Sequence, residues 1–317
     1  MRLLSTRDRH TSAIDYVYPR DIKKLNDVEI NRDDIIIVDC SITQEQFDST
    51  TRPLLDKGHR FIYDQLWESL HHKVKSDMVL PYAENGIAFF GHDISESYGW
   101  PANKSFHVPM HFWYHSALNV FRWKKVPTNP PNPNRTVTHD FLMPINSWKI
   151  PRIEFLTLLG NRIDKSIYSI GWEKKYLPDD APNFNDRHFN QSWYDDTHYS
   201  LVVESWITGP TFITEKTFKA IQYGHPFLIF GVAKSLQLLK QYGFETYANL
   251  FDESYDDEPD YTLRMQKIIE QVDAFDASKL HTVMPTVSHN WNRFHNRDLV
   301  VELLKKEIHE PIERFYS

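Results

Sequence analysis

The sequence has little of what marks several common protein classes. Its 317 residues include one cysteine, Cys40, so no disulfide can form within the chain. No apolar run approaches the roughly 18 residues of a membrane-spanning helix, and the polar first residues do not resemble a secretory signal. A net charge of −7 argues against a dedicated nucleic-acid binder, whose surface is basic. We therefore expect a protein without a membrane span in a reducing, cytoplasmic compartment.

Apolar residues are present in the amount that a folded core requires, at 41% hydrophobic and 14% aromatic. A single core seldom organises more than about 300 residues, so the length predicts two domains. Residues 126–134 contain four prolines and three asparagines and cannot continue a helix or a central strand. Pro144 and Pro151 bracket a second irregular segment. We place the boundary there and expect domains at 1–149 and 150–317.

The first half alternates apolar runs with helical patterns. Residues 34–39 are an apolar run that ends on Asp39, which is typical of a central parallel strand. Residues 42–57 predict a helix with an interruption near Pro53, and residues 60–63 and 86–90 predict further strands. This alternation predicts an α/β fold.

The second half continues the pattern. Residues 152–159 predict a strand, and Ile163, Ile167 and Ile170 share one face of a predicted helix after it. Further helices are expected at 261–275 and 299–308, the last one stopped by Pro311. Together the two halves predict two Rossmann-like domains.

The most informative stretch is 199–242. An apolar run, Leu201 to Val203, ends on Glu204, and after a loop Thr214 begins a helix as its N-cap. Gly224 ends that helix, residues 226–230 predict a buried strand, and residues 234–242 predict another helix. Ligands bind at the carboxyl ends of parallel strands in such folds. The free N–H groups of the helix start, together with Lys216, therefore suit a diphosphate there, and Glu215 could accept hydrogen bonds from ribose hydroxyls.

This stretch resembles the donor-binding motif of the fucosyltransferase-type glycosyltransferases, the α1,3-fucosyltransferase family. In that motif an apolar strand ending in Phe-Glu-Asn is followed by a loop, Thr-Glu-Lys, a helix and a strand. Here the strand ends in Val203-Glu204-Ser205 and the turn is Thr214-Glu215-Lys216, with His225-Pro226 before the last strand. Ser205 stands where the family has asparagine. The resemblance covers about 100 residues and hardly touches the N-terminal half.

The resemblance implies a GT-B-like glycosyltransferase of a soluble bacterial or viral form, with two domains facing across a cleft. The second domain would hold a GDP- or UDP-sugar as co-substrate, and the first would bind the acceptor. Glu204, Thr214, Glu215 and Lys216 would contact the donor. The family also has a strand followed by a turn with Asn and Arg or Lys, which implies that Asn161, Arg162 and Lys165 bind the donor phosphates.

A metal ion is not expected. Many sugar transferases hold a divalent cation with Asp-x-Asp, a pattern that this sequence lacks. His107, His111 and His115 have the spacing of one helical face, but Pro109 lies between them and no carboxylate is close. We expect Arg162, Lys216 and a helix dipole to neutralise the leaving diphosphate without a metal or another cofactor.

Inversion at the anomeric carbon requires a general base, which we expect on the first domain. Asp93 and Asp39 both follow predicted strands and are the candidate catalytic residues together with Glu204. His92, His111 and Tyr114 are candidate acceptor-binding residues.

Two acceptors are open, a glycan or a hydroxymethylated base in DNA. A non-catalytic nucleotide-binding or interaction protein is a third interpretation.

Overall fold

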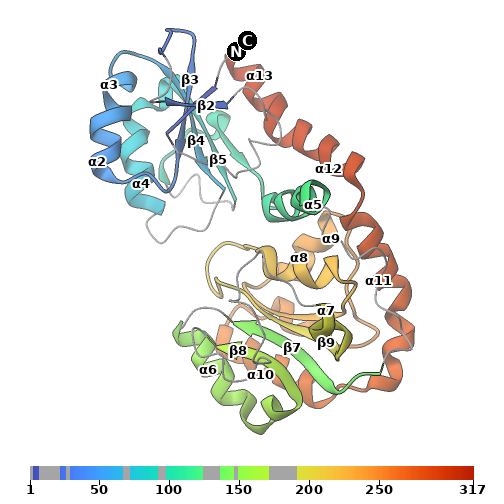
Figure 1. The fold of residues 1–317 in the computed structure, drawn as a ribbon. Helices are drawn as coiled ribbons and strands as arrows, with labels where there is room; N and C mark the ends of the chain where they lie inside the picture. Colours follow the sequence, from blue (N-terminus) through green and yellow to red (C-terminus); the bar gives the residue numbers. More distant parts are fainter. Residues whose placement is uncertain are drawn as a thin grey trace. The chain divides into compact units, whose positions relative to one another are not determined.

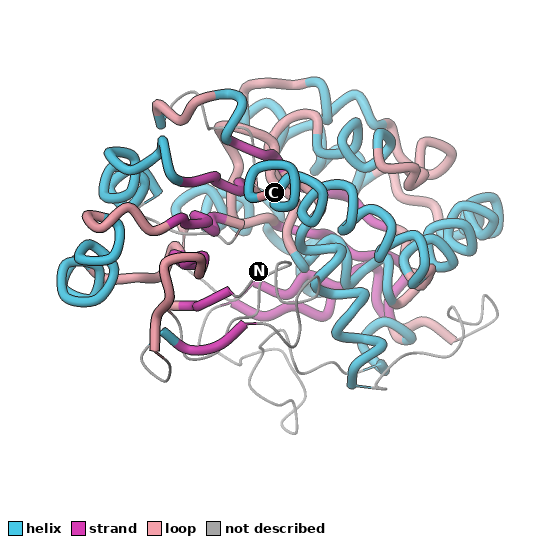
Figure 2. Tube along the Cα trace, turned by 90° about the horizontal axis from the view of Figure 1, so that it is seen from above, coloured by secondary structure: helices cyan, strands magenta, loops and turns pink. Residues whose placement is uncertain are grey.

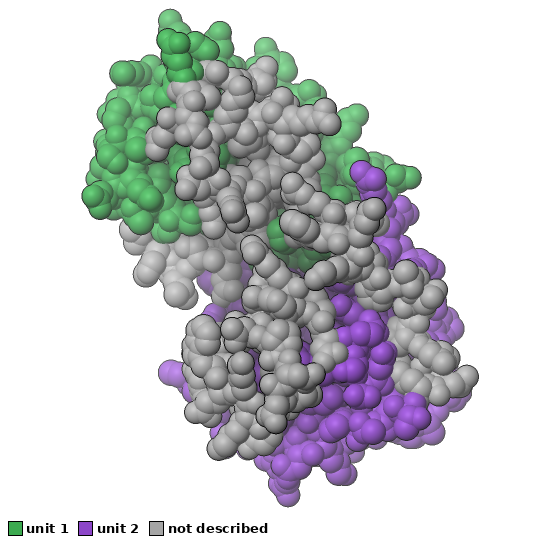
Figure 3. Space-filling view, viewed as in Figure 1, with its two compact units in different colours: residues 1–118, 298–317 green, residues 119–297 purple. Residues whose placement is uncertain are grey.

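The computed structural model describes residues 3–6, 22–25, 29–66, 72–91, 98–123, 136–145, 149–170 and 191–317. Figure 2 colours their helices and strands and leaves the other residues grey. The chain forms two compact units, one of residues 1–118 and 298–317 and one of residues 119–297 (Figure 3). The division thus lies at 118/119 rather than at the expected 149/150. The strand at 139–145 pairs with strands of the second unit, which accounts for the earlier position.

In the first unit, the described strands form one parallel sheet in the order β2-β1-β3-β4-β5-β6 (Figure 1). The expected strands at 34–39, 60–63 and 86–90 are confirmed as β3, β4 and β5. The six strands are β1 Leu3–Ser5, β2 Ile22–Lys24, β3 Ile35–Asp39, β4 Arg60–Gln65, β5 Gly86–Phe90 and β6 Ser105–His107.

Helices precede and follow these strands along the chain. The helix expected at 42–57 is split near Pro53: a π-helical turn, Phe47–Thr51, separates two short α-helices. Among the described residues, the α-helices of this unit are α2 Gln44–Gln46, α3 Arg52–Leu55, α4 His72–Val79, the first part of α5 His111–Trp123, most of α12 Arg297–Leu304 and α13 Glu310–Tyr316.

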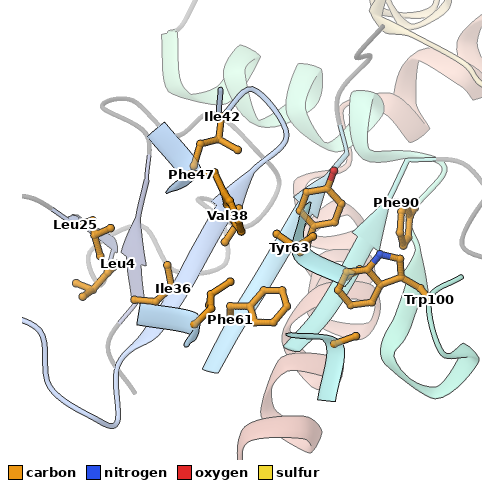
Figure 4. Close-up of a cluster of buried hydrophobic side chains, with 14 residues drawn as sticks. Leu4, Leu25, Ile36, Val38, Ile42, Phe47, Phe61, Tyr63, Phe90 and Trp100 are labelled. Carbon is orange, nitrogen blue, oxygen red and sulfur yellow. The ribbon is translucent and has the colours of Figure 1, made fainter. Parts of the chain in front are cut away.

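Alternate residues of β3, β4 and β5 build the core on one face of this sheet (Figure 4). Tyr63 stacks on Trp100 with ring centroids 6.0 Å apart and planes 8° apart. Phe61 and Phe90 meet the same indole edge to face, at 6.2 and 6.4 Å. Because successive side chains of a strand point to opposite faces, the intervening residues, such as Ile62, face the other side.

The end of the chain packs on the first unit. The Tyr316 hydroxyl donates to the Phe61 carbonyl, and Arg60 donates to the Tyr316 carbonyl at 3.1 Å. Pro311 does not stop a helix as expected. It lies in the first turn of α13, a position where a helix tolerates a residue that has no backbone N–H.

In the second unit, the described strands form a parallel sheet in the order β10-β9-β7-β8. In this order β8 lies at one edge of the sheet, next to β7, and β10 lies at the other edge, next to β9. The chain therefore moves in opposite directions across the sheet after β7 and after β9. Right-handed crossovers therefore place α6 and α8 on opposite faces, as Figure 1 shows. The strands are β7 His139–Ile145, β8 Ser166–Ile170, β9 Thr197–Val203 and β10 Phe227–Phe230.

The helices of this unit confirm the predictions for 199–242 and 261–275. Thr214 caps α8, and Gly224 and Gly243 follow the ends of α8 and α9 with positive φ, a conformation that suits glycine. In the part of this unit that the structure describes, the α-helices that follow β7 are α6 Ile150–Leu159, α7 Gln191–Asp195, α8 Glu215–Gln222, α9 Ser235–Gln241, α10 Tyr261–Asp273 and α11 Leu280–Phe294.

One assignment is reversed. Residues 150–159 form helix α6 where a strand was expected, and residues 166–170 form strand β8 where a helix was expected. The buried residues of α6 are Arg152, Phe155 and Leu159, which is a helical spacing. Pro151 at the first turn is compatible with a helix start and removes no needed hydrogen bond.

Candidate functional site

The carboxyl ends of β7 and β9 mark the switch point of the second sheet. These two strands are neighbours, but the chain continues from β7 to β8 at one edge of the sheet and from β9 to β10 at the other edge. Ligands of open α/β sheets bind in the crevice at such a point, where the loops separate. The starts of α6 and α8 and the β9–α8 loop, residues 204–214, all lie at this edge.

Glu204 joins the end of β9 to the start of α8. Its side chain is fully buried, and its carboxylate accepts hydrogen bonds from the Thr214 N–H at 3.0 Å, the Thr214 hydroxyl at 2.5 Å and the Thr217 hydroxyl at 2.8 Å. Thr214 and Thr217 are also fully buried. In the structure Glu204 thus holds the start of α8 in place. The expectation that it contacts the donor or reacts stays a prediction.

Three cationic side chains converge on the next residue, Ser205. Arg152, from the first turn of α6, and Lys216, from the first turn of α8, donate to the Ser205 hydroxyl at 3.3 and 3.2 Å. Lys149, the N-cap residue of α6, donates to the Ser205 carbonyl at 3.0 Å. Arg152 also reaches the Glu204 carbonyl at 3.3 Å. The switch point therefore carries a compact positive cluster between two helix starts.

Lys149 and Arg152 were not among the residues expected from the sequence. Residues 152–159 were expected to form a strand, so the start of a helix at Lys149 and Arg152 was not predicted. Arg152 is only 2% exposed, and arginine is seldom buried to this extent unless it is paired. A signal was present in the sequence: Pro151 followed by apolar residues at helical spacing.

Glu215 and Lys216 form an ion pair at the start of α8, with Nζ and Oε1 3.0 Å apart. Burial opposes the charge of the Glu215 carboxyl, but the neighbouring ammonium groups of Lys216 and Lys219 outweigh it and lower its pKa to about 2. Burial also opposes the charge of Lys216, but Glu215 and Glu204 outweigh it and raise its pKa. Both groups are therefore charged at neutral pH.

We expect this pair to make stability depend on acid. The Glu215 pKa is lower in the folded state than its ordinary value of 4.5, so its contribution is complete above about pH 4.5 and is lost as pH falls toward 2. The contribution at neutral pH is about 3 kcal/mol at most. Urea unfolding of Glu215→Gln and the wild type, measured from pH 7 to 2.5, should show a stability difference that shrinks through that window. A difference that stays constant with pH would contradict the assignment.

The expected phosphate residues of the segment 161–165 lie at the opposite edge of the sheet. The ten-residue helix α6 starts at the carboxyl edge and leads back to the amino edge, where Asn161, Arg162 and Lys165 precede β8. The Arg162 guanidinium binds the Asp273 carboxylate of α10, with one N–O distance of 2.6 Å. Arg162 and Lys216 therefore lie at opposite edges of the sheet. The prediction placed them together because it expected a strand at 152–159 and a helix after it, whereas the structure has a helix and then a strand.

The described candidates of the first unit are buried. Asp39 is 1% exposed and its carboxylate accepts from the Ser41 N–H at 2.7 Å, so it shapes the turn after β3. His111 is 1% exposed at the start of α5, and the buried Tyr114 donates to Glu307 near the chain end at 3.0 Å. Tyr114 therefore ties α5 to the C-terminal segment. His92 and Asp93 lie outside the described residues.

Two general properties concern the described part of the chain only. Among those residues, no group of three or more His, Cys, Asp or Glu side chains is arranged to hold a metal ion. His107 lies in β6 while His111 and His115 lie in α5, so the three histidines do not share one helix. Within the same residues, no helix has the length and apolarity needed to cross a bilayer.

No protein-family model, curated protein sequence or solved structure matches this chain significantly.

Proposed function

We propose that this protein is a glycosyltransferase that binds a nucleotide-diphosphate sugar at the carboxyl edge of its second sheet and transfers the sugar to a hydroxyl group. The observation that carries the proposal is the convergence of Lys149, Arg152 and Lys216 on Ser205 at the switch point. The likeness of the segment around Thr214-Glu215-Lys216 to the fucosyltransferase donor motif supports the same assignment.

The cationic cluster suits the chemistry of sugar transfer. When the bond between the anomeric carbon and the diphosphate breaks, negative charge grows on the leaving group. Positive side chains held in place before the reaction stabilise that charge without reorganising. The start of α8 adds the partial positive charge of a helix N-terminus, which also attracts phosphate. Lys149, Arg152 and Lys216 would therefore act as the counter-ions of the leaving diphosphate.

The remaining parts of the proposal concern the acceptor. Inverting transfer requires a base that removes the proton of the acceptor hydroxyl. We assign the acceptor and the base to the first unit in a GT-B-like arrangement, with a GDP- or UDP-sugar as donor. Asp39 and Asp93 are the candidate bases.

The assignment predicts that nucleotide binding depends on the carboxyl-edge lysines. Lys216→Ala should weaken the affinity for the preferred nucleoside diphosphate by more than tenfold, about 1.4 kcal/mol, because it removes a charge at the diphosphate. Lys149→Ala should weaken it in the same direction. The wild type is first screened by thermal unfolding with GDP, UDP, ADP and CMP, since a ligand at about 100 times its Kd stabilises by about 2.7 kcal/mol. Affinities are then measured by calorimetry.

Lys165→Ala is the matched control, because Lys165 is an exposed lysine of the same unit at the amino edge. Its affinity should equal that of the wild type. Equal losses in Lys165→Ala and Lys216→Ala, or no loss in Lys216→Ala, would refute the site. Nucleotide binding without sugar transfer to any glycan or hydroxymethylated DNA would instead favour a non-catalytic nucleotide-binding protein.

A further inference from the structure

The loop between β9 and α8 holds one large aromatic residue next to the positive cluster. Trp206 directly follows Ser205, the residue on which Lys149, Arg152 and Lys216 converge. It is only partly buried, whereas the other aromatic residue of the loop, Phe212, is 1% exposed. The proposed function gives Trp206 no role, because its argument concerns only the diphosphate of the ligand.

We propose that Trp206 is the surface on which the base of the bound nucleotide stacks. This inference rests on the proposed function, because it assumes that the positive cluster holds the diphosphate of the same ligand. It adds the binding site of the nucleoside and a residue that determines affinity for it.

The backbone on both sides of Trp206 is held in place. On one side, the Ser205 carbonyl accepts from Lys149, and its hydroxyl accepts from Arg152 and Lys216. On the other side, the Ile207 carbonyl accepts from Arg264, a guanidinium that is 1% exposed and comes from α10. Four cationic side chains thus fix the two neighbours of a partly exposed indole.

The indole itself is also oriented. Its ring meets Phe212 edge to face, with centroids 6.2 Å apart and planes 66° apart. Gly209 bends the loop beside it with φ +95°, and a Cβ at that glycine would lie 3.9 Å from the indole. An aromatic side chain that its neighbours orient and that is partly exposed is preorganised, so little conformational entropy is lost when a flat ligand stacks on it.

A second apolar side chain lies at this edge. Ile150, in the first turn of α6 between Lys149 and Arg152 in the sequence, is 72% exposed. Burying so large an apolar side chain against a ligand is favourable. A positive cluster beside an indole and an exposed isoleucine fits a ligand with a charged part and a flat, weakly polar part. A nucleoside diphosphate has both.

Stacking on Trp206 can be tested by comparing ligands with and without a base. Calorimetry on the full chain measures affinities for inorganic pyrophosphate and for the best-binding of GDP, UDP and ADP. Aromatic stacking contributes substantially to base binding and accepts any base. Trp206→Ala should therefore weaken the nucleoside diphosphate tenfold or more and leave pyrophosphate affinity within twofold of the wild type. Trp206→Phe should restore most of the nucleotide affinity.

The outcomes separate this inference from the proposed function. Wild type that binds neither pyrophosphate nor any of the nucleotides overturns both. Wild type that binds them, with Trp206→Ala unchanged for the nucleotide, overturns the stacking alone. An equal loss for pyrophosphate and nucleotide in both Trp206 variants also overturns it, because Trp206 would then only support the loop. Lys216→Ala should weaken both ligands and so serves as the reference for an anion contact.

Discussion

Replacing Glu204 with alanine should lower the free energy of unfolding by about 3–5 kcal/mol. The change removes a fully buried carboxylate that accepts three hydrogen bonds, and it leaves the Thr214 N–H and the hydroxyls of Thr214 and Thr217 without that acceptor. It also removes the tie between the end of β9 and the start of α8. Urea unfolding followed by circular dichroism measures the loss.

Two further variants define what the Glu204 result means. Glu204→Gln keeps the shape and one carbonyl oxygen, but its amide nitrogen can only donate, so an intermediate loss is expected. Glu270→Ala, on the exposed side of α10, is the control and should change stability by no more than about 0.5 kcal/mol. A Glu204→Ala protein as stable as the wild type, yet without nucleotide binding, would show that Glu204 contacts the ligand directly and would reverse the positioning role.

Arg264→Met should destabilise the second unit by about 3 kcal/mol or more. The buried guanidinium donates to the carbonyls of Gly231 at 3.0 Å, of Ile207 at 2.5 Å and of Glu258. Methionine fills similar space but donates no hydrogen bond, and each buried acceptor without a donor costs about 1–3 kcal/mol. The three carbonyls belong to the β9–α8 loop, the residue after β10 and the segment before α10. Denaturant unfolding measures the change.

Arg264→Lys is the informative companion variant. A lysine keeps the charge but presents a single ammonium group in place of the planar fork, so it cannot reach three separate carbonyls in the same geometry. We expect it to recover only part of the stability. Arg162→Ala, an arginine on the exposed amino edge, should have a much smaller effect. An Arg264→Met protein with wild-type stability would mean that the loop holds its conformation without the guanidinium.

Both predictions follow from the same arrangement. The β9–α8 loop carries Ser205 and Trp206, and two buried groups anchor it. Glu204 binds Thr214 at the start of α8, and Arg264 binds the Ile207 carbonyl. A binding site whose parts are fixed before the ligand arrives loses less entropy on binding. Variants that retain the fold but loosen the loop should therefore bind nucleotide more weakly.

The sequence by itself determined the elements whose signals are local. Thr214 is a good N-cap and lies before an amphipathic run, so α8 begins where it was expected. The apolar runs of β3, β5 and β10 are bounded by polar residues, glycine or proline, and these strands lie where they were expected. The run at Leu201 to Val203 located the end of β9, although the strand begins earlier, at Thr197. The position of Lys216 beside a helix start followed from these signals alone.

Tertiary structure decided what those signals leave open. An apolar run such as residues 153–159 is compatible with a buried strand or a buried helix, and α6 is the form in which Arg152, Phe155 and Leu159 are buried together. That choice moved Arg162 to the amino edge, where it binds Asp273, and brought Arg152 to Ser205. Strand order likewise set the switch point, because pairing between β7 and β9 joins residues about 60 positions apart. Contacts over such distances depend on the whole chain, so no local pattern encodes them.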